Sequence, residues 1–312
     1  MTRIPTTATA MTSTGAALGL AERRLAEGRL AALVWGEEGA PTWLALHGWL
    51  DNAASFSRLA PLLARRLGIR IVAIDMSGHG LSRPLAGNLD YAIWDYCHDL
   101  LDAMDDLGLE RAPLLAHSLG AGVACLLAAA LPERVERLVL IDGLGALTTA
   151  PQETAQQLGR SLKAHRRRRS RSPRYADLDS AVEARVVGGA TPVDAETVRD
   201  IVARNLAPAD DGQLQLRTDP RLLRPSPVRL TDEQVAHLLE AIACEVLLIE
   251  GRDGILGDSP RGIAARARVR QLTRHVLEGG HHLHASPSHV QAVADTIVNA
   301  LTGDPGAPAA SS

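Results

Sequence analysis

The chain has 312 residues, of which 46% are hydrophobic and 22% charged, and its formal net charge is −3. This is the composition of a globular protein, and the length fits one large α/β domain with an insertion. The small net charge gives no reason to expect binding to nucleic acid or to an anionic membrane surface. Three scattered cysteines, Cys97, Cys125 and Cys244, predict neither a disulfide framework nor a thiolate metal site, and they favour a cytoplasmic location.

The two ends of the chain have the composition of disordered segments. Residues 1–18 are rich in Thr and Ala and lack the continuous apolar region of a signal peptide. Residues 303–312 are rich in small residues and proline. No apolar run reaches the length of a membrane span. We therefore expect a disordered leader, a disordered tail and no membrane partner.

Between these ends, apolar segments typical of strands alternate with segments of helical periodicity. The expected strands are 30–36, 42–49, 69–75, 112–117, 134–142, 244–251 and 274–280. The expected helices are 56–68, 91–108, 119–131 and 290–301. Because the strands are apolar without clean alternation, they predict an α/β fold with a mostly parallel sheet and helices on both faces. Residues 145–240 interrupt this alternation of strands and helices. We expect them to form a helical lid, inserted between the two parts of the core at 19–144 and 241–302.

A single serine, Ser118, lies where an expected strand turns directly into an expected helix, in LLAHSLGAGVACLLAAA. So tight a turn requires small residues two positions before and after the serine, and Ala116 and Gly120 are small. The turn lifts the hydroxyl off the sheet, at a helix N-terminus that favours a developing negative charge. A serine that only caps the helix would explain Ser118 alone, but not its small neighbours. Ser118 is therefore a candidate nucleophile, which needs a base and an acid.

Candidate bases lie near the C-terminal end, in LEGGHHLHASPSHV. This loop carries His281, His282, His284 and His289, and a neutral histidine is the natural proton acceptor at physiological pH. Histidines so close together could also bind a metal. The sequence lacks the helical His-Glu-x-x-His spacing and any nearby thiolate, so we expect no metal. His289, and also His284, fit surface histidines of a loop.

Four motifs, in this order along residues 30–301, resemble the α/β-hydrolase superfamily. LALHGWLDNAASF resembles its oxyanion-loop segment, IDMSGHGLS its turn after the fourth strand, AHSLGAG its nucleophile elbow and EGGHHLHASP its histidine loop. HGWLDNAASF and EVLLIEGRDG are most similar to the serine-hydrolase-like subgroup. The resemblance implies the α/β-hydrolase fold with a helical lid.

The resemblance also implies roles for individual residues. Ser118 takes the position of the nucleophile, and His281 that of the base, because His281 and His284 reproduce the Gly-His-x-x-His spacing; His282 is the alternative base. The backbone N–H groups of Leu119 and Trp49 would bind the oxyanion, each lowering the barrier by about 3 kcal/mol. His47 and Gly48 would shape the loop that carries Trp49, with Gly48 letting the backbone come close to the substrate oxygen.

The acid of the triad has two candidates. The family usually places it after the strand EVLLIEG, as Gly-x-x-Asp, whereas GRDGI has Asp253 one residue early. Asp142, at the end of LVLID, is the second candidate, because some relatives take the acid from that earlier strand. Asp142 could instead only cap a loop. We favour Asp253 over Asp142 and interpret Asp75 as structural. The chain departs from the family pattern at two further places, with Ala116 for Gly and a histidine loop one residue short before Pro287.

The arginine-rich sequence GRSLKAHRRRRSRSPR, residues 159–174, has three possible interpretations: it could bind an anionic substrate, bind RNA, or form a helix face exposed to solvent. Successive helical residues turn by about 100°, so these arginines cannot all line one cleft, although one or two could lie at its mouth. The domain as a whole is not basic, and we expect no nucleic-acid partner.

The predicted function is that of a cytoplasmic serine hydrolase that cleaves an ester or related acyl bond of a small-molecule substrate through an acyl-enzyme. A serine at the elbow argues against haloalkane dehalogenase and epoxide hydrolase chemistry, which need a carboxylate nucleophile. No glycine-rich phosphate loop precedes a helix, so no cofactor is expected. Two alternatives stay open: a non-catalytic binding protein on the same fold, motivated by the displaced acid, and cleavage of a thioester or carbon–carbon bond by the same residues.

Overall fold

The computed structural model describes residues 21–167 and 173–303. The expected leader, 1–18, and the expected tail beyond residue 303 lie outside these ranges. Among the helices of the described ranges, none is long and apolar enough to cross a bilayer.

Within the described ranges, the centre of the fold is an eight-stranded sheet with the order β1-β2-β4-β3-β5-β6-β10-β11. Its strands are β1 (Ala21–Leu25), β2 (Leu30–Trp35), β3 (Thr42–Leu46), β4 (Arg70–Asp75), β5 (Ala112–His117), β6 (Val135–Ile141), β10 (Glu245–Asp253) and β11 (Leu272–Gly280). β2 pairs antiparallel with β1 and with β4, and the other pairings are parallel. The prediction of a mostly parallel sheet is confirmed.

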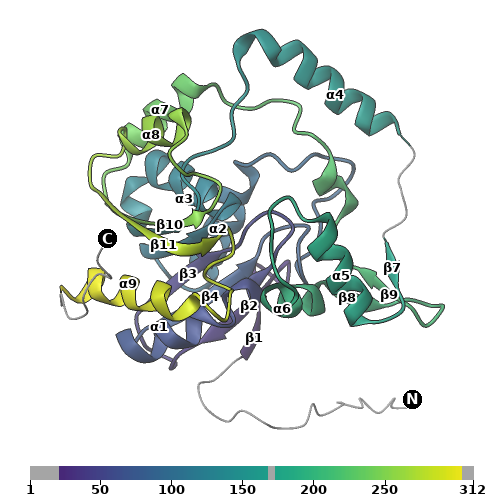
Figure 1. The fold of residues 1–312 in the computed structure, drawn as a ribbon, viewed down its shortest axis with the longest axis horizontal. Helices are drawn as coiled ribbons and strands as arrows, with labels where there is room; N and C mark the ends of the chain where they lie inside the picture. Colours follow the sequence, from purple (N-terminus) through teal and green to yellow (C-terminus); the bar gives the residue numbers. More distant parts are fainter. Residues whose placement is uncertain (1–20, 168–172, 304–312) are drawn as a thin grey trace.

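Helices cover both faces of the sheet because alternate side chains of its strands are apolar on both sides. In β5, Leu114 and Ala116 belong to the core cluster of one face and Leu115 to that of the other. The first face is covered by α2 (Asp95–Asp106), α3 (Leu119–Ala130) and α7 (Asp232–Ala241), and the second by α1 (Leu59–Leu67) and α9 (Val290–Thr302). Figure 1 shows α1 and α9 side by side, although they come from opposite ends of the sequence.

Residues 145–240 contain helices, as expected, but also a small sheet that was not expected. Beside α7, the helices are α4 (Thr154–Arg166), α5 (Leu178–Gly188) and α6 (Ala195–Asn205). β7 (Arg174–Tyr175), β9 (Leu214–Leu216) and β8 (Leu206–Pro208) form a three-stranded antiparallel sheet in that order, counted over the described residues. Strands of two or three residues are too short to show a sequence period, which is why the sequence analysis missed them.

The remaining regular elements are short. They are the 3₁₀ helices Ala53–Phe56, Pro132–Arg134, Pro151–Glu153 and Pro220–Leu223, and the helix α8 (Pro260–Arg266) between β10 and β11. The first of these lies in the loop after β3, directly behind the HGW sequence. Its N-cap is Asn52, whose side-chain oxygen accepts a hydrogen bond from the Ala54 N–H at 3.0 Å.

Buried polar contacts hold α5 and α6 against the loop that follows β3. Arg185 on α5 donates to Asp51 at 2.9 Å, and the Asn52 amide donates to the Ile201 carbonyl of α6 at 2.8 Å. Arg204, at the end of α6, pairs with the fully buried Asp75 at 2.9 Å. Asp75 also accepts hydrogen bonds from the backbone N–H groups of Ala53 and Leu81, in agreement with the structural role expected for it. These contacts hold α5 and α6 against the loop after β3 and the end of β4.

Candidate active site

Ser118 occupies a sharp turn between β5 and α3 with a strained backbone. Its φ is 53° and its ψ is −112°, a conformation that residues other than glycine rarely adopt and that costs about 1–3 kcal/mol. The turn is closely packed: a Cβ on Gly120 would lie 2.3 Å from the Leu46 carbonyl oxygen, and one on Gly143 would lie 2.8 Å from the Ser118 Cα. The predicted strand–serine–helix junction is therefore present, and the small residue expected at position 120 is required by crowding.

The structure brings together Ser118, His281 and Asp142. The Ser118 hydroxyl lies 2.9 Å from Nε2 of His281, and Nδ1 of the same ring lies 2.6 Å from Oδ2 of Asp142. Because a carboxylate only accepts hydrogen bonds, Nδ1 carries the proton in the neutral ring and Nε2 is left free to accept the serine proton. Asp142 is fully buried and His281 is 7% exposed, so the bond between them is shielded from bulk water.

The loop after β10 encloses the carboxylate of Asp142. The Ile255 N–H donates to Oδ2 at 2.8 Å, and a Cβ on Gly254 would lie 2.1 Å from Oδ1. Oδ1 is buried and has no hydrogen-bond partner among the described residues. The GRDGI sequence thus contributes to the site through a backbone N–H and a glycine, not through its aspartate.

The preference for Asp253 as the partner of His281 does not agree with this geometry and is corrected in favour of Asp142. β10 runs two residues further than the sequence predicts, so that Asp253 still pairs with Gly280 of β11. Its side chain is exposed and makes no hydrogen bond or ion pair within the described part of the chain. Asp142 also does not serve as a simple loop cap, because its carboxylate is directed at the imidazole of His281.

His282, the alternative base, faces a different carboxylate. Its Nε2 lies 3.1 Å from Oδ2 of Asp51, whose other oxygen accepts from Arg185. His117 donates from Nε2 to the carbonyl of His281 at 2.9 Å and so fixes the backbone that carries the candidate base. The sequence analysis assigned no role to Asp51 or His117, because their contacts join segments that lie far apart in the sequence.

His284 is completely buried, which corrects the suggestion that it is a surface residue. Its ring packs 4.2 Å from the ring of His117 and 5.4 Å from that of Phe56, measured between centroids. Neither of its nitrogens has a partner among the described residues. His289 is only partly buried, and its Nδ1 lies 3.0 Å from the Ser286 hydroxyl.

Burial sets the charge states of this second layer. Desolvation lowers the pKa of His284 to about 3 and the pKa of His117 well below its usual range, so both rings are neutral at physiological pH. Burial alone would raise the pKa of Asp51, but the charges and hydrogen bond of His282 and Arg185 outweigh it and hold that pKa well below its usual range. The Asp51 carboxylate is therefore ionised.

Asp51, His117 and His282 are also the described residues that could together hold a metal ion. Their ligand atoms lie within 4.8 Å of one another, and all three are buried. However, Arg185 and His282 already engage the two oxygens of Asp51, and a neighbouring guanidinium opposes the binding of a cation. The Asp51 carboxylate therefore forms an ion pair with Arg185 and a hydrogen bond with His282.

Of the two expected oxyanion donors, Leu119 directly follows Ser118 in the chain, and Trp49 lines the same pocket. Leu119 begins α3, and Trp49 follows the His-Gly pair after β3; neither N–H donates a hydrogen bond to a described residue. His47 holds this loop in place by accepting from the Met76 N–H at 3.0 Å and by its Nδ1, 2.8 Å from the Gly48 carbonyl. Gly48 is required for a reason that the sequence analysis did not give: a Cβ there would lie 2.8 Å from Nδ1 of His117.

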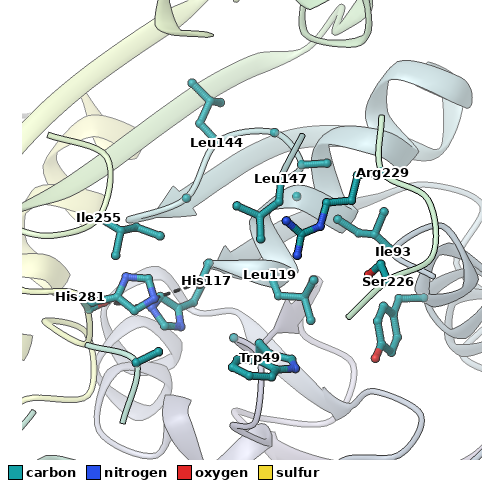
Figure 2. Close-up of a pocket in the computed structure, with 18 of the residues that line it drawn as sticks. Trp49, Ile93, His117, Leu119, Leu144, Leu147, Ser226, Arg229, Ile255 and His281 are labelled. Carbon is teal, nitrogen blue, oxygen red and sulfur yellow. Dashed lines mark hydrogen bonds between the residues drawn. The ribbon is translucent and has the colours of Figure 1, made fainter. Parts of the chain in front are cut away.

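A pocket of about 570 Å³ opens in front of Ser118 and His281. Figure 2 shows His281 and Ile255 on one side of it, and Ile93, Ser226 and Arg229 on the other. Its apolar wall includes Trp49, Ile93, Leu119, Leu144, Leu147 and Ile255. The volume is that of a site for a small molecule. None of the described residues of the arginine-rich sequence 159–174 lines it.

An α/β hydrolase is defined by three features found here. They are a mostly parallel sheet, a strained serine between a strand and a helix, and a histidine loop that meets this serine at the strand ends. A family model described as alpha/beta hydrolase fold matches residues 41–179. The chain belongs to the α/β-hydrolase superfamily and, by its curated relatives, to the serine-hydrolase-like subgroup.

Three comparisons illustrate this relationship. A serine hydrolase-like protein of Dictyostelium discoideum is 33% identical over 269 residues, which cover 82% of this chain and 74% of the relative. The crystal structure of a hypothetical protein from Pseudomonas aeruginosa PAO1 is 44% identical, with a TM-score of 0.82, and covers 88% of this chain and 95% of that one. A thioesterase domain from the curacin biosynthetic pathway, at 22% identity and a TM-score of 0.74, covers 92% of this chain and 100% of that domain and shares the fold.

Proposed function

We propose that this protein is a serine hydrolase that cleaves a carboxylic ester or related acyl bond of a small molecule. The observation that carries the proposal is the continuous hydrogen-bonded chain from Ser118 through His281 to Asp142, with distances of 2.9 and 2.6 Å. A nucleophile within reach of a base, and a base oriented by a third group, is the arrangement that activates a serine.

In the first half of the reaction, Oγ of Ser118 attacks the acyl carbonyl carbon while Nε2 of His281 takes the hydroxyl proton. Asp142 stabilises the imidazolium that forms, without itself becoming protonated. The N–H groups of Leu119 and Trp49 bind the oxyanion of the tetrahedral intermediate. The intermediate collapses when His281 returns its proton to the leaving oxygen, which leaves an acyl ester on Ser118.

In the second half, a water molecule takes the place of the leaving group. His281 accepts a proton from it as its oxygen attacks the acyl carbon, and the second tetrahedral intermediate expels Ser118, which recovers its proton from the imidazolium. The products are a carboxylic acid and the free enzyme. The contact of Asp142 with His281 supports this proposal over the non-catalytic alternative, which the displaced acid had motivated.

The 145–240 segment acts in this proposal as a lid that sets the size and polarity of the pocket. It contributes Leu147, Arg185, Leu222 and Arg229 to the lining of that pocket. The small-molecule substrate, the cytoplasmic location and the absence of a nucleic-acid partner stay predictions.

The proposal is tested by a fluorophosphonate probe, which labels an activated serine, followed by peptide mapping. We expect labelling at Ser118 and turnover of p-nitrophenyl esters, and both should be lost in Ser118→Ala with stability changed by less than about 1 kcal/mol. Ser226→Ala is the matched control, because Ser226 lines the same pocket without contacting His281. Esterase activity that persists in Ser118→Ala, or a folded wild-type protein that neither labels nor turns over any ester or thioester, would contradict the proposal.

A further inference from the structure

The pocket in front of Ser118 carries an excess of positive charge. Its lining includes five arginines: Arg185, Arg221, Arg224, Arg229 and Arg261. The carboxylates of the lining are Asp51 and Asp90. Both have partners inside the protein: Asp51 pairs with Arg185 at 2.9 Å, and a carboxylate oxygen of Asp90 lies 2.5 Å from Nε2 of His165. A ligand in this pocket therefore meets more guanidinium than carboxylate.

Most of these guanidinium groups already have partners within the chain. The partners are Asp51 for Arg185, Asp219 for Arg221, Asn88 and His165 for Arg224, and the carbonyl of Ala146 for Arg261. Arg221 in addition donates to three backbone carbonyls of the 85–89 segment. These four arginines hold the walls of the pocket together.

Arg229 differs from the others. It is partly buried, and in the described ranges of the chain its guanidinium makes no hydrogen bond and no ion pair. Figure 2 shows its side chain pointing into the pocket, toward Leu147 and Leu119 and on the side opposite His281. Its backbone is held in place, because the next residue, Leu230, bridges to Thr148 and accepts from the Thr149 N–H at 3.0 Å.

The guanidinium of Arg229 therefore faces a largely apolar pocket from a fixed backbone and has no anion to pair with among the described residues. Its planar fork of N–H donors fits a carboxylate or a phosphate, which it binds through two parallel hydrogen bonds. We propose that Arg229 binds an anionic group, a carboxylate or a phosphate, on the substrate whose acyl carbon is attacked by Ser118. The inference rests on the proposed function of the same pocket and adds a substrate class to it.

The test compares esters that differ only in this anionic group. The p-nitrophenyl half-esters of hexanedioic and octanedioic acid carry a terminal carboxylate, and p-nitrophenyl hexanoate and octanoate are their neutral counterparts. We expect the wild-type enzyme to favour a half-ester in kcat/KM by about tenfold or more, the size of one charge-assisted pair.

Arg229→Gln should remove this preference and change kcat/KM for the neutral esters by less than about twofold, while Arg229→Lys should keep part of it. Arg270→Gln is the control, because Arg270 is an exposed arginine without a partner in the described residues and does not line the pocket. An Arg229→Gln enzyme that keeps a wild-type preference for the half-esters would overturn the inference.

A second arm separates the two sources of the anion. Hexanoyl-coenzyme A carries phosphates on its leaving group, and the hexanoyl thioester of N-acetylcysteamine carries none. A preference for the coenzyme A thioester that disappears in Arg229→Gln would assign Arg229 to a phosphate, whereas a preference for the half-esters would assign it to a carboxylate. Equal rates in both comparisons would contradict the inference and leave the proposed serine chemistry intact.

A binding measurement keeps the inference independent of turnover. In the Ser118→Ala variant, calorimetry with monomethyl hexanedioate should detect binding that dimethyl hexanedioate does not match, and adding Arg229→Gln should weaken it by about tenfold. Equal affinities for the two esters would contradict the assignment of Arg229 to a carboxylate. A wild-type enzyme that binds the monomethyl ester but turns over no ester would instead count against the proposed catalytic chain.

Discussion

The imidazole of His284 is enclosed between the rings of Phe56 and His117. It behaves as an apolar spacer, because neither nitrogen has a partner in the described part of the molecule and burial lowers the pKa of His284 to about 3. A buried polar group without a hydrogen bond costs stability, so this residue supports the fold less well than a hydrocarbon of similar size. Its position behind His117 nevertheless keeps the histidine loop closely packed.

We predict that His284→Leu leaves the free energy of unfolding at pH 7.5 unchanged within about 1 kcal/mol or raises it, since no hydrogen bond is lost. Below pH 6 the variant should be more stable than the wild-type protein, because the unfolded chain has one fewer histidine to protonate. Urea unfolding at both pH values measures this. A loss of several kcal/mol at pH 7.5 would show that the imidazole has a polar partner.

At the scale of elements, the loop between β10 and α8 decides how the acid is held. Gly254 in this loop leaves room for the Asp142 carboxylate, since a Cβ there would lie 2.1 Å from Oδ1. Ile255 adds a backbone N–H to the same carboxylate. A change of one methyl group in this loop therefore acts on a side chain that is more than a hundred residues away in sequence.

We predict that Gly254→Ala displaces Asp142 and lowers kcat by about tenfold or more, because a wrongly placed acid no longer orients the imidazole. Gly159→Ala is the control, since α4 leaves open space at that position and alanine favours a helix by about 0.5–1 kcal/mol. The measurement is kcat on one ester together with the melting temperature. A fully active Gly254→Ala enzyme would mean that the loop does not constrain the acid.

Sequence motifs predict those parts of the site that depend on local structure. Ser118 and His281 could be assigned because a tight strand–helix turn and a Gly-Gly-His loop each leave a signature within a few residues. The choice between Asp142 and Asp253 could not, since both follow strands that end at the same edge of the sheet. It depends on how far β10 continues beside β11. The contact of Asp51 with His282 and Arg185 joins three distant segments, and no local pattern predicts it.

For the molecule as a whole, buried histidines dominate the response to acid. Besides His117 and His284, burial lowers the pKa of His47 to about 4 and that of His79 to about 3. In the unfolded chain these groups have pKa values of about 6.5. Their neutral forms are therefore kept in the folded state while the unfolded state takes up protons, and stability that is complete above about pH 6.5 is lost as the pH falls.

We predict that the free energy of unfolding is nearly constant between pH 7 and 8 and falls between about pH 6.5 and 4, by about 1.4 kcal/mol per pH unit for each of these histidines. Asp51, whose pKa is held low by His282 and Arg185, adds to the loss below about pH 4. Urea titrations at pH 7.5, 6 and 5 check the slope. Equal stability at pH 7.5 and pH 5 would show that these rings are not buried in their neutral form.

The most direct test of the proposed triad compares kcat for Asp142→Asn and Asp253→Asn on one p-nitrophenyl ester, with melting temperatures recorded to exclude unfolding. Asparagine at position 142 would stabilise the wrong tautomer of His281, and we predict a loss of about 10⁴-fold. Asp253→Asn should retain at least about half of the wild-type kcat, since that side chain is exposed and unpaired within the described residues. A nearly normal Asp142→Asn enzyme, or an inactive but folded Asp253→Asn enzyme, would contradict the account.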